Sequence, residues 1–426
     1  MPTMLRSNWA LLLGILLLML GSGLQSSLLP IRASLAGFPT STTGLVLSAY
    51  YAGYLLGWAL VPGLIAKVGH VRVFAAMGSL VSISVLMHAV IVSAPVWFLA
   101  RMLTGASLCG IFMTTESWLN SNATNAIRGQ LLATYMVILL AGLSVGPFLL
   151  NLASPSSASL FILVAMLVSL AIIPMLLSAS PAPALAPSMR LGLKALFALS
   201  PLGTVAIFCV GVAQSGIYGG VGTIYGRAIG LSIPGVSLFM SLTILGGMLF
   251  QWPVGWLSDR FDRRKILTLV AFLTAVCALL AIPAQSNTRL VFILFFLTGG
   301  FALPLYSLCV AHANDYMTKE QMVGASGALL LVNGVGSVLG PGLSAFFIGR
   351  IGAYGFPLFI GCVHAFIGIF ALWRMTRRSA PSMAAQGPTI PLATPTPMVT
   401  TIGQDHAVEQ SVDDHVVLAE QDERRA

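Results

Sequence analysis

Two long apolar segments flank the sequence Gly255-Trp256-Leu257-Ser258-Asp259-Arg260-Phe261-Asp262-Arg263-Arg264-Lys265 in this 426-residue chain. Residues 259–265 hold six charges in seven positions, whereas residues 1–378 contain only five acidic residues in all. Charge gathered so tightly between apolar segments indicates a polar loop that joins two membrane-spanning helices. The sequence around it must therefore be interpreted with the bilayer as its solvent.

The composition excludes an ordinary soluble domain, because 57% of the residues are hydrophobic and only 8% are charged. A membrane span needs about 20 apolar residues, and the segments lack the alternation of a β-barrel, so we expect helices. The first apolar run continues to Ile31, which favours an uncleaved first helix over a signal peptide. Twelve candidate spans lie at about 8–31, 43–66, 72–94, 96–120, 129–152, 158–178, 201–225, 233–257, 264–284, 289–311, 323–349 and 355–376.

Basic residues indicate the orientation of these spans, because loops that stay in the cytoplasm carry an excess of Lys and Arg. With a cytoplasmic N-terminus and alternating helices, fourteen basic residues fall on the inner side and four on the outer side. The net charge of +9 then reports topology and contact with anionic lipids, not binding of nucleic acid. The inner set is Arg6, Lys67, Arg72, Arg128, Arg190, Lys194, Arg260, Arg263, Arg264, Lys265, Lys319, Arg374, Arg377 and Arg378; the outer set is Arg32, Arg227, Arg289 and Arg350.

The chain repeats itself at an offset of about 194 residues: Gly146-Pro147 recurs as Gly340-Pro341, and Gly105 recurs as Gly299. The repeat predicts an all-α membrane protein with twelve transmembrane helices in two pseudo-symmetric six-helix bundles. Glycines of this kind allow close helix packing; the alternative for the two Gly-Pro pairs is a hinge between the halves. We expect a first bundle at 1–178, a cytoplasmic linker at 179–200, a second bundle at 201–378 and a disordered cytoplasmic tail at 379–426.

These features resemble the major facilitator superfamily of transporters over residues 1 to about 378. Besides the twelve-span plan and the repeat, the resemblance rests on the pattern G-x-x-x-D-R-x-x-R-R at 255–264 and on Arg101-x-x-x-Gly105. Segments 115–120 and 311–315 are similar to the uncharacterised bacterial YcaD-type branch. Asp262 departs from the pattern, in which a second glycine is usual, and we expect it to keep a left-handed turn there. The resemblance implies alternating access between the two halves.

In that family the first, fourth, seventh and tenth spans line a central cavity, which implies where a substrate would bind. An ordinary interhelical hydrogen bond is the alternative role for each polar group there. Arg101 has three alternatives: it snorkels beside Trp97, contacts backbone carbonyls, or attracts an anionic substrate. A cavity almost free of acids disfavours multivalent organic cations and allows neutral amphiphiles, lipids or monoanions. The matching residues are Gln25, Arg101, Thr104, Met113, Gln214, Tyr218 and Tyr306.

Candidate coupling or gate residues lie near the cytoplasmic ends of the spans. Glu116 is the only acid in the first 258 residues, and a buried ionisable group is costly unless it has a function or a partner. We expect an ion pair with Arg128, Arg72 or Lys67; proton transfer and substrate contact are the alternatives. Asp315 occupies the comparable place in the tenth span, near Lys319.

By the repeat, the 255–265 loop should lie against the inner end of the fifth span. Asp259 would then contact Arg128 or the first amides of that helix, which favour an anion. Arg260, Arg263 and Arg264 complete this expected gate.

The sequence thus predicts a secondary active transporter of a small molecule, proton-coupled and possibly acting in efflux, in a bacterial inner membrane. A membrane sensor or scaffold that keeps the transporter fold, or an uncoupled facilitator, are the alternatives. We expect a monomer with no cofactor or metal. All five cysteines fall in predicted spans, which argues against a zinc site, and the absence of a phosphate-binding loop argues against direct use of ATP. No nucleophile, base and orienting group cluster in the sequence, so an enzyme is not expected.

The orientation has a direct test. A reporter fused after Arg378 should report a cytoplasmic C-terminus, because the basic residues divide fourteen to four in favour of that side. Green fluorescent protein fused there should fluoresce, and alkaline phosphatase should be inactive. Active alkaline phosphatase at this position would overturn the topology.

Overall fold

A computed structural model describes residues 2–121, 125–176 and 192–377, and in these ranges the chain forms helices and no strand. The predicted tail and most of the predicted linker lie outside the described residues. The helices are α1 (Pro2–Leu35), α2 (Thr40–Val68), α3 (His70–Val90), α4 (Ala94–Ser121), α5 (Asn125–Val145), η1 (Gly146–Leu152), α6 (Ser159–Leu176), α7 (Leu193–Leu199), α8 (Pro201–Gly216), η2 (Ile217–Val221), α9 (Gly222–Ala228), α10 (Ile233–Arg260), α11 (Arg263–Leu280), α12 (Thr288–Ala302), α13 (Leu305–Asn314), α14 (Lys319–Ile351), η3 (Gly352–Tyr354) and α15 (Gly355–Met375).

Within the described ranges, ten helical stretches are long and apolar enough to cross a membrane. One of them, Gly324–Met375, contains both α14 and α15. Helix α11 is not among the ten; it has 18 residues and begins with Arg263, Arg264 and Lys265. The chain is therefore an all-α protein with multiple membrane spans, and the count of twelve remains a prediction that depends on α11.

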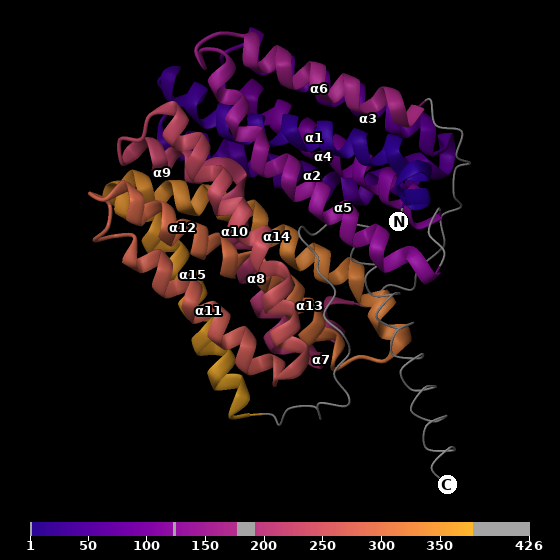
Figure 1. The fold of residues 1–426 in the computed structure, drawn as a ribbon, viewed down its shortest axis with the longest axis vertical. Helices are drawn as coiled ribbons and strands as arrows, with labels where there is room; N and C mark the ends of the chain where they lie inside the picture. The colour runs from indigo at the N-terminus through magenta and orange to yellow at the C-terminus, as the bar shows by residue number, and fades with distance from the viewer. Residues whose placement is uncertain (1, 122–124, 177–191, 378–426) are drawn as a thin grey trace.

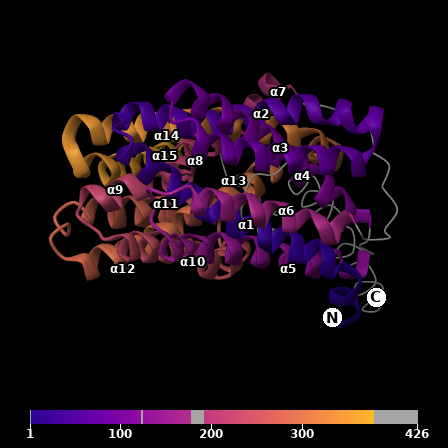
Figure 2. The same ribbon diagram turned by 90° about the horizontal axis from the view of Figure 1, so that it is seen from above.

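The helices form two groups that lie side by side, α1–α6 in one and α8–α15 in the other (Figures 1 and 2). Within the first group α1 packs against α5 and α6, and α4 packs against α2 and α3. Within the second, α8 packs against α14 and α15, and α12 packs against α10 and α11. Two seams join the groups, one between α2 and α14 and the other between α5–η1 and α10.

Three predicted spans are interrupted, and a bend had been considered from the sequence only for the fifth of them, at Gly146-Pro147. The fifth span changes at Gly146 from α5 into the tighter helix η1. The seventh is broken by Gly220, whose φ of +104° is open to glycine and strained for other residues. The tenth ends as α12 and restarts as α13 around Pro304, whose ring and missing N–H disrupt a helix interior.

Four glycines set the closest helix contacts, in matching pairs. A Cβ on Gly105 would lie 1.9 Å from the carbonyl oxygen of Tyr50, and a Cβ on Gly53 would lie 1.9 Å from that of Met102, so α2 and α4 touch through their backbones. In the second group, Gly246 and Gly299 bring α10 and α12 together in the same way. Close approach at glycine is a main source of helix association in lipid.

The contacts between the two groups can be placed relative to the two ends of the molecule. We call the end where α2, α4 and α10 finish the basic face, and the other end the opposite face. Hydrogen bonds join the groups toward the opposite face: Ser144 donates to the Ser241 carbonyl (3.0 Å), and the Gly342 amide donates to Ser48 (3.1 Å). Gly44 also lies there, so close to α14 that a Cβ would be 2.4 Å from that of Ala345. The seams are thus tight at the opposite face.

The α2–α4 contact can be tested by substitution. Gly105→Ala should lower the free energy of unfolding by about 1–3 kcal/mol, because its methyl group overlaps the Tyr50 carbonyl and forces the helices apart. Thermal unfolding of the purified protein in detergent measures the change. Gly63→Ala on α2 is the matched control, since its Cβ would have no neighbour within 4 Å. Equal melting temperatures for the two variants would contradict the role of this contact.

Candidate functional site

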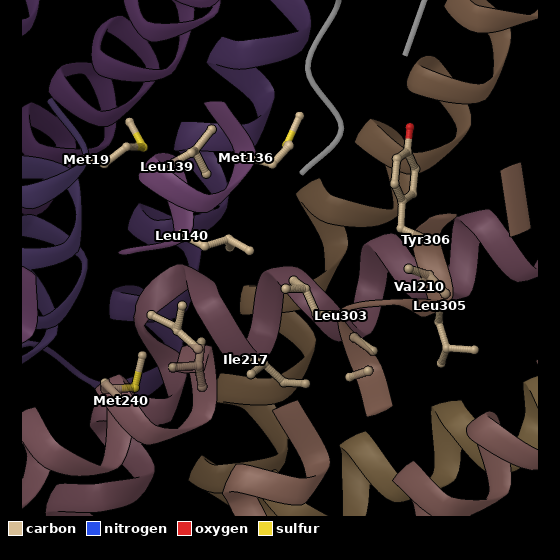
Figure 3. Close-up of a cluster of buried hydrophobic side chains, with 14 of the residues drawn as sticks. Met19, Met136, Leu139, Leu140, Val210, Ile217, Met240, Leu303, Leu305 and Tyr306 are labelled. Atoms are coloured by element: carbon tan, nitrogen blue, oxygen red, sulfur yellow. The ribbon is translucent and has the colours of Figure 1, made fainter. Parts of the chain in front are cut away.

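A cavity of about 200 Å³ lies between the two groups of helices. Both groups contribute to its lining: α1, α2, α4 and α5 on one side, and α8, η2, α10 and α14 on the other. Its walls are mostly apolar; Met19, Leu139 and Leu140, labelled in Figure 3, belong to the first group, and Leu303 belongs to the second. A small molecule held here would touch both halves at once.

Four of the predicted cavity residues line this space: Gln25, Arg101, Gln214 and Tyr218. Two of them also hold the fold. The Gln214 amide donates to the carbonyls of Ala302 (2.8 Å) and Leu303 (3.2 Å), at the break between α12 and α13. The Tyr218 hydroxyl donates to the Gly299 carbonyl (3.3 Å). Gln214 and Tyr218 therefore shape the cavity wall as well as facing it.

Three residues expected in the cavity lie elsewhere. Thr104 is fully buried and donates to the Ala100 carbonyl (2.9 Å), in contact with Ser84. Met113 packs in a small separate cluster with Val61 and Cys109. Tyr306 is buried in the main apolar cluster with Val210 and Leu305, as Figure 3 shows. Each stands on an expected span, but its side chain faces a neighbouring helix.

Four spans that the prediction left out also line the cavity, and two of them contribute polar side chains. Helix α2 contributes Tyr50, Tyr51 and Tyr54, and α14 contributes Asn333 and Ser337. Tyrosines at positions i, i+1 and i+4 of an otherwise apolar span were a usable signal, since a buried hydroxyl needs a partner. The lone Asn333 in the eleventh span was a similar one.

Arg101 is the charged side chain among the lining residues, and it is only 5% exposed. Its guanidinium carbon lies 4.8 Å from the centre of the Tyr50 ring, which places a cation over an aromatic face. Among the described residues, no carboxylate forms an ion pair with Arg101, and its Nε has no hydrogen-bond partner. In the described structure, the Arg101 side chain therefore neither snorkels to the surface nor donates to a backbone carbonyl.

Glu116 lies on the same helix, fifteen residues further toward the basic face, or about 22 Å along the axis. It is fully buried and accepts a hydrogen bond from the Tyr135 hydroxyl on α5 (2.9 Å). Of its expected partners, Lys67 and Arg72 are exposed where α2 meets α3, and the Arg128 side chain lies outside the described ones. Tyr135 was not predicted, because nothing local in the sequence links α4 to α5.

The charged loop is organised around Arg263, the first residue of α11, which is 1% exposed. Arg263 pairs with Asp259 on α10 (3.3 Å) and with Asp315 at the end of α13, and its Nε donates to Ser258 (3.1 Å). Asp315 thus pairs with the first residue of α11, at the start of the ninth span. This cluster ties three helices of one group together at the basic face. The expected contact of Asp259 with Arg128 stays a prediction, because that side chain lies outside the described ones.

The remaining loop residues have local roles. Arg260 is exposed and stacks on Trp256, 3.9 Å from its ring centre. Asp262 begins α11 by accepting from the Arg264 amide (3.0 Å), with φ of −52°, so the expected left-handed turn is wrong. Burial raises the pKa of the Asp262 carboxyl, but hydrogen bonds from Arg264 outweigh this and hold the pKa below its ordinary value.

Comparisons with known proteins agree with this geometry. The Major Facilitator Superfamily pattern matches residues 203–404. An uncharacterized MFS-type transporter YcaD of Salmonella arizonae is 27% identical over 347 residues, which cover 81% of this chain and 90% of the relative. An uncharacterized MFS-type transporter of Enterobacter sp. (strain 638) is 28% identical over 353 residues, with the same coverage.

Solved structures show the same fold. The nucleoside transporter NupG superposes with a TM-score of 0.69 at 17% identity, covering 87% of this chain and 99% of its own. The human organic anion transporter MFSD10 (TETRAN) gives 0.62 at 17% identity, covering 87% of this chain and 100% of its own. Together, the fold, the cavity and these matches make the chain similar to the transporters of the major facilitator superfamily, and they indicate a multi-pass membrane transporter and not an enzyme.

Proposed function

We propose that this protein is a secondary active transporter that carries a small molecule by alternating access, in the inner membrane of a bacterium and with the basic face in the cytoplasm. The observation that carries the proposal is a cavity lined by both halves. A ligand there is released to either side only if the halves rotate against each other. Its site needs no rebuilding during that motion, because each half contributes a preformed wall.

The tight seams at the opposite face support one assignment of state. Ser144 bonds to Ser241, Gly342 bonds to Ser48, and Gly44 packs closely against Ala345, so the two halves are in contact toward the opposite face. We therefore assign the structure to the inward-facing state. The outward-facing state requires these contacts to separate and new ones to form at the basic face.

Proton coupling is assigned to Glu116. It is fully buried near the basic face and is held by a neutral hydroxyl donor, Tyr135. Burial favours the neutral form of a carboxyl group, and access to water favours the charged form. A change in its access to water during the cycle would therefore bind and release a proton. The competing role is an ion pair with Arg128 that breaks when the halves move.

The direction of transport and the monomeric state are part of the proposal. The bacterial relatives are uncharacterized, and NupG and MFSD10 share only the fold at 17% identity, so their printed substrates do not transfer to this chain. We propose proton-driven efflux by a single chain surrounded by lipid. An uncoupled facilitator would show the same cavity, and measured fluxes distinguish the two.

The state assignment predicts the effect of adding a side chain at Gly44, where α2 meets α14. Gly44→Val should hold the opposite face open, because its side chain overlaps Ala345 and the Pro341 carbonyl. Spin labels at Ser41 and Gly349, exposed on α2 and α14, report the separation in liposomes by pulsed electron paramagnetic resonance. The variant should populate longer distances than the wild type. Gly63→Val, whose Cβ would meet nothing within 4 Å, should leave the distances unchanged. Identical distributions for Gly44→Val and the wild type would sink the assignment.

The coupling role is tested in proteoliposomes with a substrate found in a metabolite and drug panel. Wild-type protein should accumulate it against its gradient, since each unit of pH gradient supplies about 1.4 kcal/mol per proton. Glu116→Gln should keep exchange of labelled for unlabelled substrate but lose accumulation. Tyr135→Phe, which removes the hydrogen bond and keeps the carboxyl group, should retain coupling. Loss of both exchange and accumulation in folded Glu116→Gln, at every pH, would assign Glu116 to an ion pair instead. Wild-type protein that binds without net flux would contradict transport itself.

A further inference from the structure

Among the residues that the structure describes, the cavity lining carries one fixed positive charge and no negative one. No aspartate or glutamate is among its lining residues, and Arg101 keeps its charge at any physiological pH. In an apolar interior such a charge is costly unless it is paired. The face of Tyr50 offsets part of this cost, but it is not an anion and leaves the guanidinium N–H groups without acceptors among the described residues.

A second observation points the same way. Three cavity-lining groups that can donate a hydrogen bond are buried without a partner: Arg101 Nε, Gln25 Nε2 and the Tyr54 hydroxyl. They come from α4, α1 and α2, so their presence at one cavity is not a local sequence effect. Buried polar groups in folded proteins nearly always have partners. A cavity with spare donors and no acid suits a ligand that brings acceptor oxygens.

The remaining walls define the other end of such a ligand. Tyr50, Tyr51 and Tyr54 form a tyrosine row: the centre of the Tyr50 ring lies 5.0 Å from that of Tyr51 and 6.2 Å from that of Tyr54. Met19, Leu139 and Leu140 of the same half also line the cavity. These side chains offer dispersion contacts and aromatic faces, which suit an apolar or flat carbon skeleton.

We propose that the cavity binds an organic monoanion, whose acidic group pairs with Arg101 and whose apolar body lies against the tyrosine row and the leucines of α5. One arginine balances one charge, so polyanions are disfavoured, and cations are repelled. Gln25 and Tyr54 supply further donors to the acceptor atoms of the ligand. This inference rests on the proposed function, since it names the substrate class of the same site.

Binding to the purified full-length protein tests the inference without a known substrate. Isothermal titration with benzoate and with octanoate covers a flat and a lipid-like carboxylate. Benzamide and octanamide are their neutral counterparts, and benzylammonium is a cation of similar shape. At least one carboxylate should bind, and its amide should bind about 10- to 100-fold more weakly, as expected for a hydrogen bond to a charged group.

The variants locate the site. Arg101→Gln should lose the preference for the carboxylate over its amide, while Arg101→Lys should keep part of it. Arg350→Gln is the matched control: Arg350 also stacks on an aromatic ring, that of Phe346 at 5.1 Å, but lies outside the cavity lining. Melting temperatures establish that Arg101→Gln is folded; loss of one buried charge should not lower its stability.

Each further outcome decides for or against the inference. Equal binding of carboxylates and amides, binding of the cation, or binding of chloride alone would overturn it. The proposed function fails separately, in the distance and flux measurements on Gly44→Val and Glu116→Gln. If the protein changes state but does not bind carboxylates, the proposed function stands and the monoanion inference fails. If it binds carboxylates but does not change state, the monoanion inference stands and the proposed function fails.

Discussion

Direct backbone contact between α2 and α4 sets the geometry of the cavity. Gly53 and Gly105 leave no side chain between the two helices, so Tyr50 is carried to within cation–π distance of Arg101. In the second half, Gly246 and Gly299 fix α10 against α12, and the Gly299 carbonyl accepts from Tyr218. Lipid gives no hydrophobic force for helix association, so such contacts carry the packing. The geometry of the site thus follows from the positions of these four glycines.

The helical fold could be predicted from the sequence because the bilayer leaves a chain few options. A run of about 20 apolar residues must satisfy its own peptide groups, and a helix does so within the segment. The interruptions were harder. Pro304 was a visible signal inside the predicted span 289–311, but Gly220 is one of 43 glycines, and only its contacts with Ser26 and Pro30 of α1 distinguish it.

The cavity could be predicted only in part, for a reason that is itself physical. A helix that is apolar all round gives no hydrophobic stripe from which to infer its rotation about its axis. Gln25 and Arg101 line the cavity of the structure, whereas Thr104 and Tyr306, from spans chosen in the same way, are not among its lining residues. The pairing of Arg263 with Asp315 spans 52 residues, and such a contact depends on tertiary packing that local sequence does not encode.

The Gln214 side chain has a mechanical consequence for the second half. Its amide occupies the carbonyls that the break near Pro304 sets free, so a bent tenth span is the relaxed form and a straight one would leave Gln214 without these acceptors. Because α8 carries Gln214 and continues into the kink at Gly220, the bends of the seventh and tenth spans are clamped to each other beside the cavity. A bound molecule that changes the bend of the seventh span must therefore also change the bend of the tenth.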